Sequence, residues 1–348
     1  MSIVGGFDVH RHQLTFDYLD AATGEVRRGQ VRPADRLALR AWLKRFAGRD
    51  DVAFALEGCT GWRFVAEELT AAGVEVHLAE PADTAAARGR KKRAKTDRAD
   101  ARLLRELLAE GRLPVSWIPP DHVLEIRTLG RLYCALMDQR RAWQQRIHAQ
   151  LYHQGVPPVP GLLTGHGRAE LETAALSAAG RQAIEVALAA IDSLSAQIQP
   201  LRAQLIAAAK AQPGCRALNR LYGVGWLCAV IIWAELGDCR RFARSDQAVR
   251  YTGLDITVYS SDVKRSPGRL ARQGSPELRW ALYEAAKCAS RRSSPDYGYY
   301  ASTAARLGGK RPTLSVARKL ARRAYHILAE LGDTAFAPSM PTPLETTA

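Results

Sequence analysis

The sequence predicts an α/β domain at its N-terminal end, a pair of long helices in the middle and a mainly α-helical domain at its C-terminal end. Three observations predict this order. Short apolar runs alternate with helical segments over the first third of the chain. Apolar residues then recur at three- and four-residue spacing, and basic, mostly helical sequence follows from residue 213. The 348 residues are enough for two or three domains, each with its own core.

The N-terminal domain, residues 1–118, begins with three predicted strands. Ser2–His10 is a short apolar run that suits a central strand, and two further runs flank Ala21–Gly24 as a hairpin, Gln13–Tyr18 and Glu25–Val31. Helices and strands then alternate, which is typical of an α/β domain. The expected elements are a helix at Arg36–Phe46, a strand at Asp51–Glu57, a helix at Trp62–Ala72, a strand at Val74–Ala79, and a helix that the segment Lys95–Ala101 opens.

The middle region, residues 119–210, carries apolar residues at helical spacing on both sides of a Pro- and Gly-rich breaker at Gln154–Gly161. The alternation of three and four residues is that of a coiled-coil seam. We expect two long helices that form an antiparallel hairpin or a dimerisation arm, as a coiled coil or as ordinary bundle helices. The second seam contains Ile184, Leu188, Ile191, Ile198 and Leu205.

The C-terminal domain, residues 211–335, contains a predicted helix-hairpin-helix-like turn at Leu221–Leu227. Gly223 and Gly225 lie between apolar helices, so backbone amides at the start of the second helix could hold a phosphate. A tight turn without a ligand explains the two glycines equally well. We expect residues 336–348 to form a disordered tail.

The formal net charge is +15, and the excess lies mainly in the C-terminal third. Residues 216–330 carry 21 basic and nine acidic side chains, whereas residues 1–87 carry ten basic and thirteen acidic ones. Such a field suits a polyanion, most simply nucleic acid. A GC-rich genome would also raise the Arg content.

The six cysteines form no C-x-x-C pair, so neither a zinc site nor a disulfide framework is indicated. The longest apolar run, Trp226–Ala234, is too short to cross a bilayer, and no signal sequence is recognised at the start. We therefore expect a cytoplasmic protein without membrane contact, associated with the nucleoid when active.

Four carboxylates are predicted to converge. Asp8 lies on the first strand, Glu57 ends a later strand, and Asp97 and Asp100 share one face of a helix. Converging carboxylates need a cation, and hard oxygen ligands favour Mg²⁺ or Mn²⁺. A solvated helix start neutralised by its basic neighbours is the alternative for the aspartate pair. His10 and His12 lie close by, either as substrate contacts or as polar residues of the rim.

The sequence contains, in order, the motifs Phe7–His10, Leu56–Gly58 and Lys95–Ala101. These resemble the D, E and D-x-x-D motifs of the RuvC-like domain in DEDD transposases of insertion sequences, the IS one-ten family. Tyr222–Leu254 and Tyr259–Arg279 resemble the second conserved domain of that family, and the likeness covers about residues 3–330. It implies an RNase H-like (RuvC-like) fold for the first domain and a transposase domain at the C-terminal end.

The resemblance also implies a serine that attacks DNA and forms a covalent phosphoserine. Counting from Gly253 places Ser261 in the nucleophile's position, with Ser260 as its rival. Ile256 replaces the proline that is usual in the family, and Asp262 replaces the usual glycine.

The implied partners are donor and target DNA, a guide RNA encoded by the element, and further copies of the chain in a dimer or tetramer. Basic residues and the two turn glycines are the predicted nucleic-acid contacts. They are Arg90, Lys91, Lys92, Arg93, Lys95, Gly223, Gly225, Lys264, Arg265, Arg269, Arg272, Arg279, Lys310, Arg311, Arg318, Lys319 and Arg322.

The sequence is also compatible with two other functions. A metal-dependent junction resolvase or nuclease would need the carboxylates and not the serine. A non-enzymatic protein that bridges nucleic acids would need neither.

Overall fold

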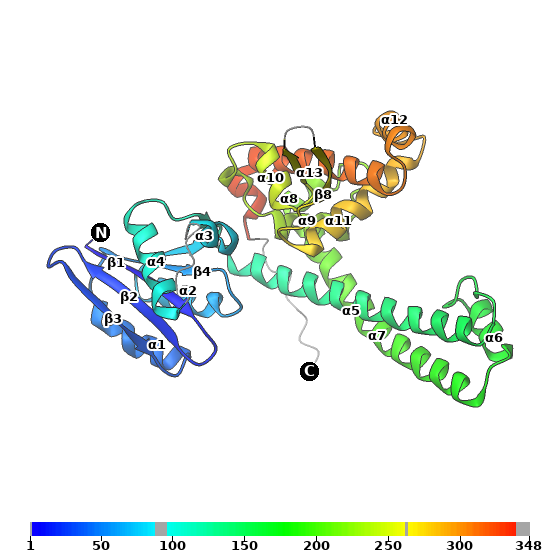
Figure 1. Ribbon diagram of the computed structural model, residues 1–348, viewed down its shortest axis with the longest axis horizontal. Helices are drawn as coiled ribbons and strands as arrows, with labels where there is room; N and C mark the ends of the chain where they lie inside the picture. Colours follow the sequence, from blue (N-terminus) through cyan, green and yellow to red (C-terminus); the bar gives the residue numbers. More distant parts are fainter. Residues whose placement is uncertain (1, 88–95, 262–263, 339–348) are drawn as a thin grey trace. The chain divides into compact units, whose positions relative to one another are not determined.

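The computed structural model describes residues 2–87, 96–261 and 264–338 of the chain (Figure 1). These residues divide into two compact units, Met1–Ile118 and Pro119–Ala348. The segments predicted as a middle region and a C-terminal domain therefore belong to one unit. Of the predicted tail 336–348, residues 339–348 lie outside the described residues, as does the basic run 88–95, whereas Phe336 ends a 3-10 turn and is buried against Trp233, so the ordered chain extends past the predicted start of the tail.

The first unit is built on a six-stranded mixed sheet with the order β3-β2-β1-β4-β5-β6. The central strand β1 pairs antiparallel with β2 and parallel with β4. β5 continues the sheet parallel to β4, and β6 pairs antiparallel at the far edge. The strands are β1 Ile3–Val9, β2 Leu14–Asp20, β3 Glu25–Val31, β4 Val52–Glu57, β5 Glu75–Ala79 and β6 Val115–Ser116.

The two faces of this sheet carry different residues because side chains alternate along a strand. On one face, Phe7, Phe16 and Phe54 pack with Trp42 of α1 in an aromatic core. On the other face, α4 lies against β1 and β2. The helices of this unit are α1 Arg36–Leu43, which continues as a 3-10 turn to Phe46, α2 Trp62–Ala71, α3 Pro81–Ala87 and α4 Asp97–Ala109. A mixed α/β unit of this kind fits an RNase H-like DEDD transposase domain.

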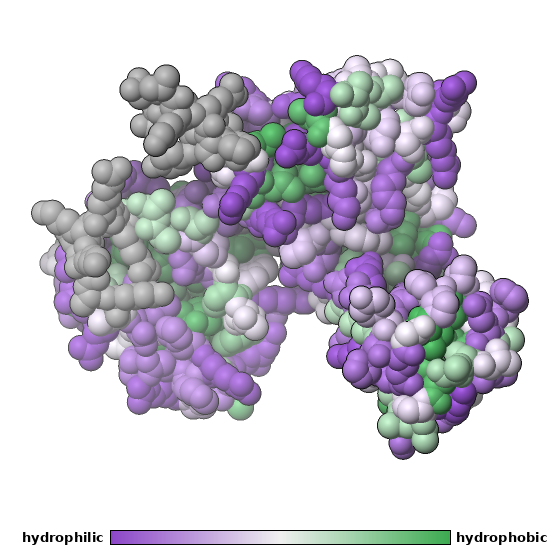
Figure 2. All heavy atoms as spheres, turned by 45° about the vertical axis from the view of Figure 1, so that its right-hand side comes forward, coloured by the Kyte–Doolittle hydropathy of each residue, from purple (hydrophilic) through white to green (hydrophobic). Residues whose placement is uncertain are grey.

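The second unit begins with a long helical arm. Helices α5 (Asp121–His153) and α7 (Ala178–Ala211) run antiparallel, and the short helix α6 (Gly165–Thr173) lies at the far end (Figure 1). Ile184 and Ile191 of α7 are buried with Ile147 and Leu151 of α5, so this part of the seam is covered within one chain. In Figure 2 the end of the arm comes forward, and apolar residues gather on it among polar ones.

The arm continues into the C-terminal helices without a domain boundary. Arg131 of α5 forms an ion pair with the buried Glu235 of α9, with 2.8 Å between Nε and Oε1, and Arg127 donates to the carbonyl of Ala234. α7 also packs on α9. The remaining elements are α8 Pro213–Leu218, α9 Trp226–Leu236, α10 Ser245–Tyr251, α11 Pro276–Lys287, α12 Tyr297–Leu307, α13 Arg311–Leu331, and the hairpin β7 Ile256–Ser261 with β8 Lys264–Leu270.

Candidate catalytic carboxylate cluster

The strand register brings Asp8 and Glu57 to the same edge of the sheet. In the parallel pair, Phe7 of β1 lies beside Leu56 of β4. The next residue on each strand is therefore Asp8 or Glu57, and both belong to the face opposite the aromatic core. Neighbouring strands lie about 4.8 Å apart, so the two carboxylates start from adjacent backbone positions.

Helix α4 approaches β1 so closely that only glycine fits between them. A Cβ built on Gly6 would lie 2.2 Å from the carbonyl oxygen of Ala101. Gly6 and Asp8 lie on the same face, two residues apart. The missing side chain at Gly6 thus allows the first turn of α4 to come down beside Asp8.

A buried ion pair fixes α4 against β2. Asp17 is 1% exposed, and its Oδ1 lies 2.6 Å from the Nε of Arg105 on α4. Arg28 of β3 donates its Nε to the other carboxylate oxygen at 2.6 Å. Because a buried carboxylate is costly without partners, this pair selects one position of α4 on the sheet.

The start of α4 is set by its N-cap. The hydroxyl of Thr96 accepts a hydrogen bond from the amide of Ala99 at 3.2 Å. Asp97 and Asp100 therefore lie in the first turn, where carboxylates are favoured by the helix dipole. The side-chain amide of Gln13 donates to Asp97 at 2.9 Å and fixes its orientation.

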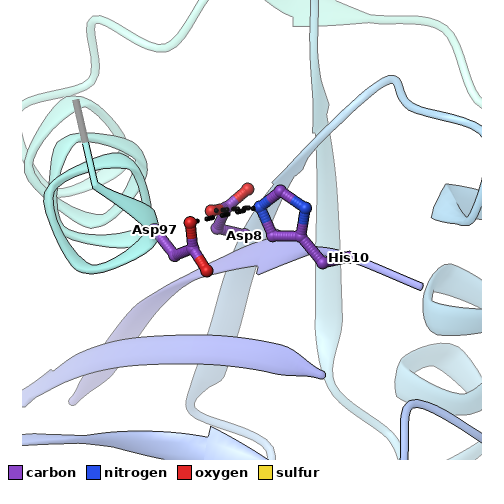
Figure 3. A group of neighbouring side chains, drawn as sticks. All are labelled: Asp8, His10 and Asp97. Carbon is purple, nitrogen blue, oxygen red and sulfur yellow. Dashed lines mark hydrogen bonds and ion pairs between the residues drawn. The ribbon is translucent and has the colours of Figure 1, made fainter. Parts of the chain in front are cut away.

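Within the described residues, ligand atoms of Asp8, His10 and Asp97 lie within 4.8 Å of one another. Figure 3 shows the imidazole of His10 at one side of the two carboxylates, with one ring nitrogen turned toward both. Its Nε2 lies 3.0 Å from Asp8 Oδ2 and 3.4 Å from Asp97 Oδ1. The arrangement joins the end of β1 to the first turn of α4.

The electrostatics of the cluster centre on Asp8. Burial raises the pKa of its carboxyl group above the ordinary value, the His10 imidazole opposes this, and the charges of Asp100 and Asp97 raise the pKa further. Asp8 therefore lies in a field of excess negative charge, and a cation would relieve it.

The four predicted carboxylates are thus related in different ways. Asp8 and Asp97 come together directly, and Asp100 is close enough for its charge to act on Asp8. Glu57 is placed by strand register at the same sheet edge. His10 was predicted as a substrate contact or a rim residue and not as a member of the cluster, although it follows Asp8 by two residues, just past the end of β1.

The serine region forms the β7–β8 hairpin, in which Ser261 pairs with Lys264 and Ser260 with Arg265. The side chains of residues 258–267 lie outside the described part of the structure, as does all of Asp262. The base of the hairpin is described. Gly253 has φ +68°, and a Cβ there would lie 2.0 Å from the carbonyl oxygen of Gln273.

Three of the predicted nucleic-acid contacts form bonds to the protein's own backbone or side chains. Arg279 donates to the carbonyl of Gly274 at 2.9 Å, Arg318 donates to that of Leu254 at 2.5 Å, and Lys319 pairs with Asp296. The others that the structure describes are exposed: Arg269, Arg272, Lys310, Arg311 and Arg322. Arg90, Lys91, Lys92, Arg93 and Lys95 lie outside the described residues, and no side chain is described for Lys264 or Arg265.

The turn with the two glycines connects α8 to α9. Gly223 has φ +86°, and a Cβ there would lie 2.4 Å from the carbonyl oxygen of Ala285 on α11. Gly225 is the N-cap of α9 and provides no side-chain cap. Close packing on α11 therefore explains Gly223, and phosphate binding at the turn stays a prediction.

Two family models match this chain. Residues 5–154 match a model of DEDD transposases of the IS110 group, described as "Transposase", and residues 215–301 match the model "Transposase IS116/IS110/IS902 family". Together the matches cover more than half of the chain and contain both the carboxylate cluster and the serine hairpin. The chain belongs to the IS110 transposase family.

Curated relatives carry names of the same kind. The chain is 30% identical over 247 residues to y4rJ of Sinorhizobium fredii, whose name describes a transposase, with 63% of this chain and 60% of y4rJ covered. It is 33% identical over 84 residues to the transposase for insertion sequence element IS1111A of Coxiella burnetii, with 24% of this chain and 23% of the relative covered. The chain thus spans less than two thirds of the length of these relatives.

Among the residues that the structure describes, no helix combines the length and the apolar character needed to cross a membrane.

Proposed function

We propose that the protein is a transposase that cuts and rejoins the DNA strands of an insertion sequence. The observation that carries this proposal is the meeting of Asp8 and Asp97 at the end of β1, in a chain of the IS110 family. Oxygen ligands that converge from a strand end and a helix start are suited to phosphoryl transfer. The basic C-terminal region supplies a surface for the substrate's phosphates.

The donor set fits a divalent cation. Asp8, Asp97, Asp100 and Glu57 would hold Mg²⁺ or Mn²⁺, since both ions favour carboxylate oxygens, and His10 is a further donor. Bound there, the ion would stabilise the negative charge that develops on the reacting phosphate. Gly6 and the pair of Asp17 with Arg105 keep the two aspartate-bearing elements in place.

The proposed nucleophile is Ser261, with Ser260 as the alternative. A bond forms between its hydroxyl oxygen and phosphorus as the bond from phosphorus to a deoxyribose oxygen breaks. The serine loses its proton, and the released deoxyribose oxygen takes one up. The phosphoserine ester keeps the energy of the broken bond, so the reverse reaction with another strand needs no ATP.

The proposed partners are donor and target DNA, together with a guide RNA that the element encodes. Exchange of strands needs several broken ends held together, so we propose a dimer or tetramer of this chain. The support for the RNA and for the assembly is family membership, and for nucleic acid in general it is the net charge of +15.

Two variants test the proposal. Asp8→Asn should abolish Mg²⁺-dependent strand cleavage while the protein still binds DNA, because the change removes a charge from the cluster without changing its volume. Asp20→Asn is the matched control, since Asp20 pairs with Ile3 at the opposite end of β1. Ser261→Ala should remove the covalent protein–DNA adduct detected on a denaturing gel, and Ser260→Ala should keep it.

The alternatives give other results. Cleavage by Ser261→Ala without any adduct in the parent protein would indicate a nuclease that uses water. Full recombination by Asp8→Asn would contradict the carboxylate site and leave a protein that only bridges nucleic acids.

A further inference from the structure

A basic groove lies beside the carboxylate cluster in the first unit. It has a volume of about 440 Å³ and is lined by Asp17, Arg28, Gly29, Arg98, Ala99 and Arg102. We propose that this groove binds the phosphodiester backbone of the nucleic-acid strand that continues past the carboxylate cluster. The inference rests on the proposed function, because it assigns the strand to the same site.

The first two turns of α4 carry both features. Asp97 belongs to the cluster at β1 and the charge of Asp100 acts on Asp8, whereas Arg98 and Arg102, four residues apart, line the groove with residues of β2 and β3. Consecutive residues on a helix differ by about 100° around its axis, so Asp97 and Arg98 face neighbouring surfaces. A nucleic-acid strand that reaches the carboxylate cluster would therefore pass the groove.

The groove has more positive than negative charge. Four guanidinium groups, those of Arg28, Arg98, Arg102 and Arg105, accompany two carboxylates, Asp17 and Glu106, which leaves a surplus of two positive charges. Residues 1–87 have the opposite balance, with thirteen acidic and ten basic side chains. Most of the positive charge of the groove therefore comes from α4, within the basic segment 88–118, which carries ten basic and four acidic side chains.

The three lining arginines keep donors for a ligand. The buried Arg105 already neutralises Asp17, while the side chain of Arg28 is 52% exposed. Arg28 and Arg102 each use Nε for an acidic partner, Asp17 and Glu106 respectively. Arg98 is exposed and forms no ion pair within the described part of the chain. Guanidinium groups bind phosphate through two parallel N–H groups, which makes Arg98 the principal contact.

A purely structural role predicts a different outcome. If the arginines only hold α4 on the sheet, their replacement should lower stability and leave affinity for nucleic acids unchanged. Arg105 performs that structural role from inside, so Arg98→Gln should leave the melting temperature unchanged.

The test measures binding of full-length Arg98→Gln and Arg102→Gln to fluorescent single-stranded DNA, duplex DNA and RNA of one sequence. Each lost phosphate contact should weaken binding about four- to sixfold near 0.15 M salt and lower the slope of log affinity against log salt by about 0.7 for single strands or 0.9 for duplex DNA. The matched control is Arg27→Gln. Arg27 precedes Arg28 on β3 and pairs with Tyr18 on the opposite face, and the variant has the same change in charge.

A loss with DNA alone assigns the groove to donor or target DNA, and a loss with RNA alone assigns it to a guide strand. Equal affinities and slopes for Arg98→Gln, Arg102→Gln and Arg27→Gln with all three probes would overturn the inference and leave the proposed function intact. Failure of the parent protein to bind any probe at low salt would overturn both.

Discussion

The carboxylate cluster and the serine hairpin are held in place by different means. In the first unit, Asp8 and Asp97 project from a central strand and a capped helix, and buried side chains lock these two elements together. In the second unit, the base of the β7–β8 hairpin is held through backbone carbonyls that accept from Arg279 and Arg318. Buried packing thus positions the cluster, whereas hydrogen bonds from long side chains, together with backbone pairs such as Ala271 with Asp255, position the base of the hairpin.

The largest expected effect concerns the packing that holds the carboxylate cluster. Asp17→Asn removes the buried charge that lies 2.6 Å from Arg105 and should lower the free energy of unfolding by about 3–5 kcal/mol. Urea unfolding followed by circular dichroism measures the change. Glu110→Gln is the control, because its ion pair with Arg112 is exposed on both sides and the loss should stay below about 1 kcal/mol. Equal losses of stability in the two variants would show that Asp17 does not hold α4 on the sheet.

Gly6→Ala should cost about 1–3 kcal/mol, since the added Cβ forces α4 away from β1. The rate of DNA cleavage should fall by more than the loss of folded protein explains, because Asp97 moves with the helix. The control is Gly298→Ala on α12, where a Cβ meets open space and the change should be neutral or slightly stabilising. Unchanged cleavage by Gly6→Ala would show that the cluster tolerates movement of α4.

Arg318→Gln tests the hairpin side. Loss of the donor to the buried Leu254 carbonyl should cost about 1–2 kcal/mol and reduce adduct formation, with little change in the salt dependence of DNA binding. Arg322→Gln, one turn later on α13 and exposed, should give the reverse pattern. If Arg318→Gln instead lowered the salt dependence of DNA binding and kept the stability, Arg318 would be a phosphate contact.

The smallest effect is expected at the start of α4. Thr96→Ala removes the N-cap and should cost about 1 kcal/mol, whereas Thr96→Ser should keep most of the stability. Thermal unfolding compares the two variants. A loss of equal size in both would point to the threonine methyl group rather than the cap.

The difference between the carboxylate cluster and the serine hairpin also explains what could be predicted from the sequence. The predicted strand Glu25–Val31 has the bounds of β3, and Asp8 and Asp97 converge as expected, because apolar runs and helix caps are local signals. The β7–β8 hairpin was missed. Its second strand contains Pro267, Gly268 and several basic residues, types that are depleted in strands, so only pairing with β7 stabilises it.

Other misses have tertiary causes. The ion pair of Asp17 with Arg105 joins residues 88 positions apart, and no local pattern marks it. The arm and the C-terminal helices, predicted as separate domains, lie in one compact unit, in which Arg127 and Arg131 join α5 to α9. The hydrogen bonds of Arg279 and Arg318 to the protein's own carbonyl groups could not be predicted either, and the phosphate contacts predicted for these residues stay predictions.

The edges of the six-stranded sheet affect how readily the protein aggregates. An open edge can template strand addition from another molecule, which leads to aggregation. β3 carries the charged residues Arg27 and Arg28 along one edge, and at the other edge β6 has only two residues, Val115 and Ser116. Charge along one edge and the shortness of the other therefore discourage edge-to-edge strand pairing between copies of this chain at high concentration.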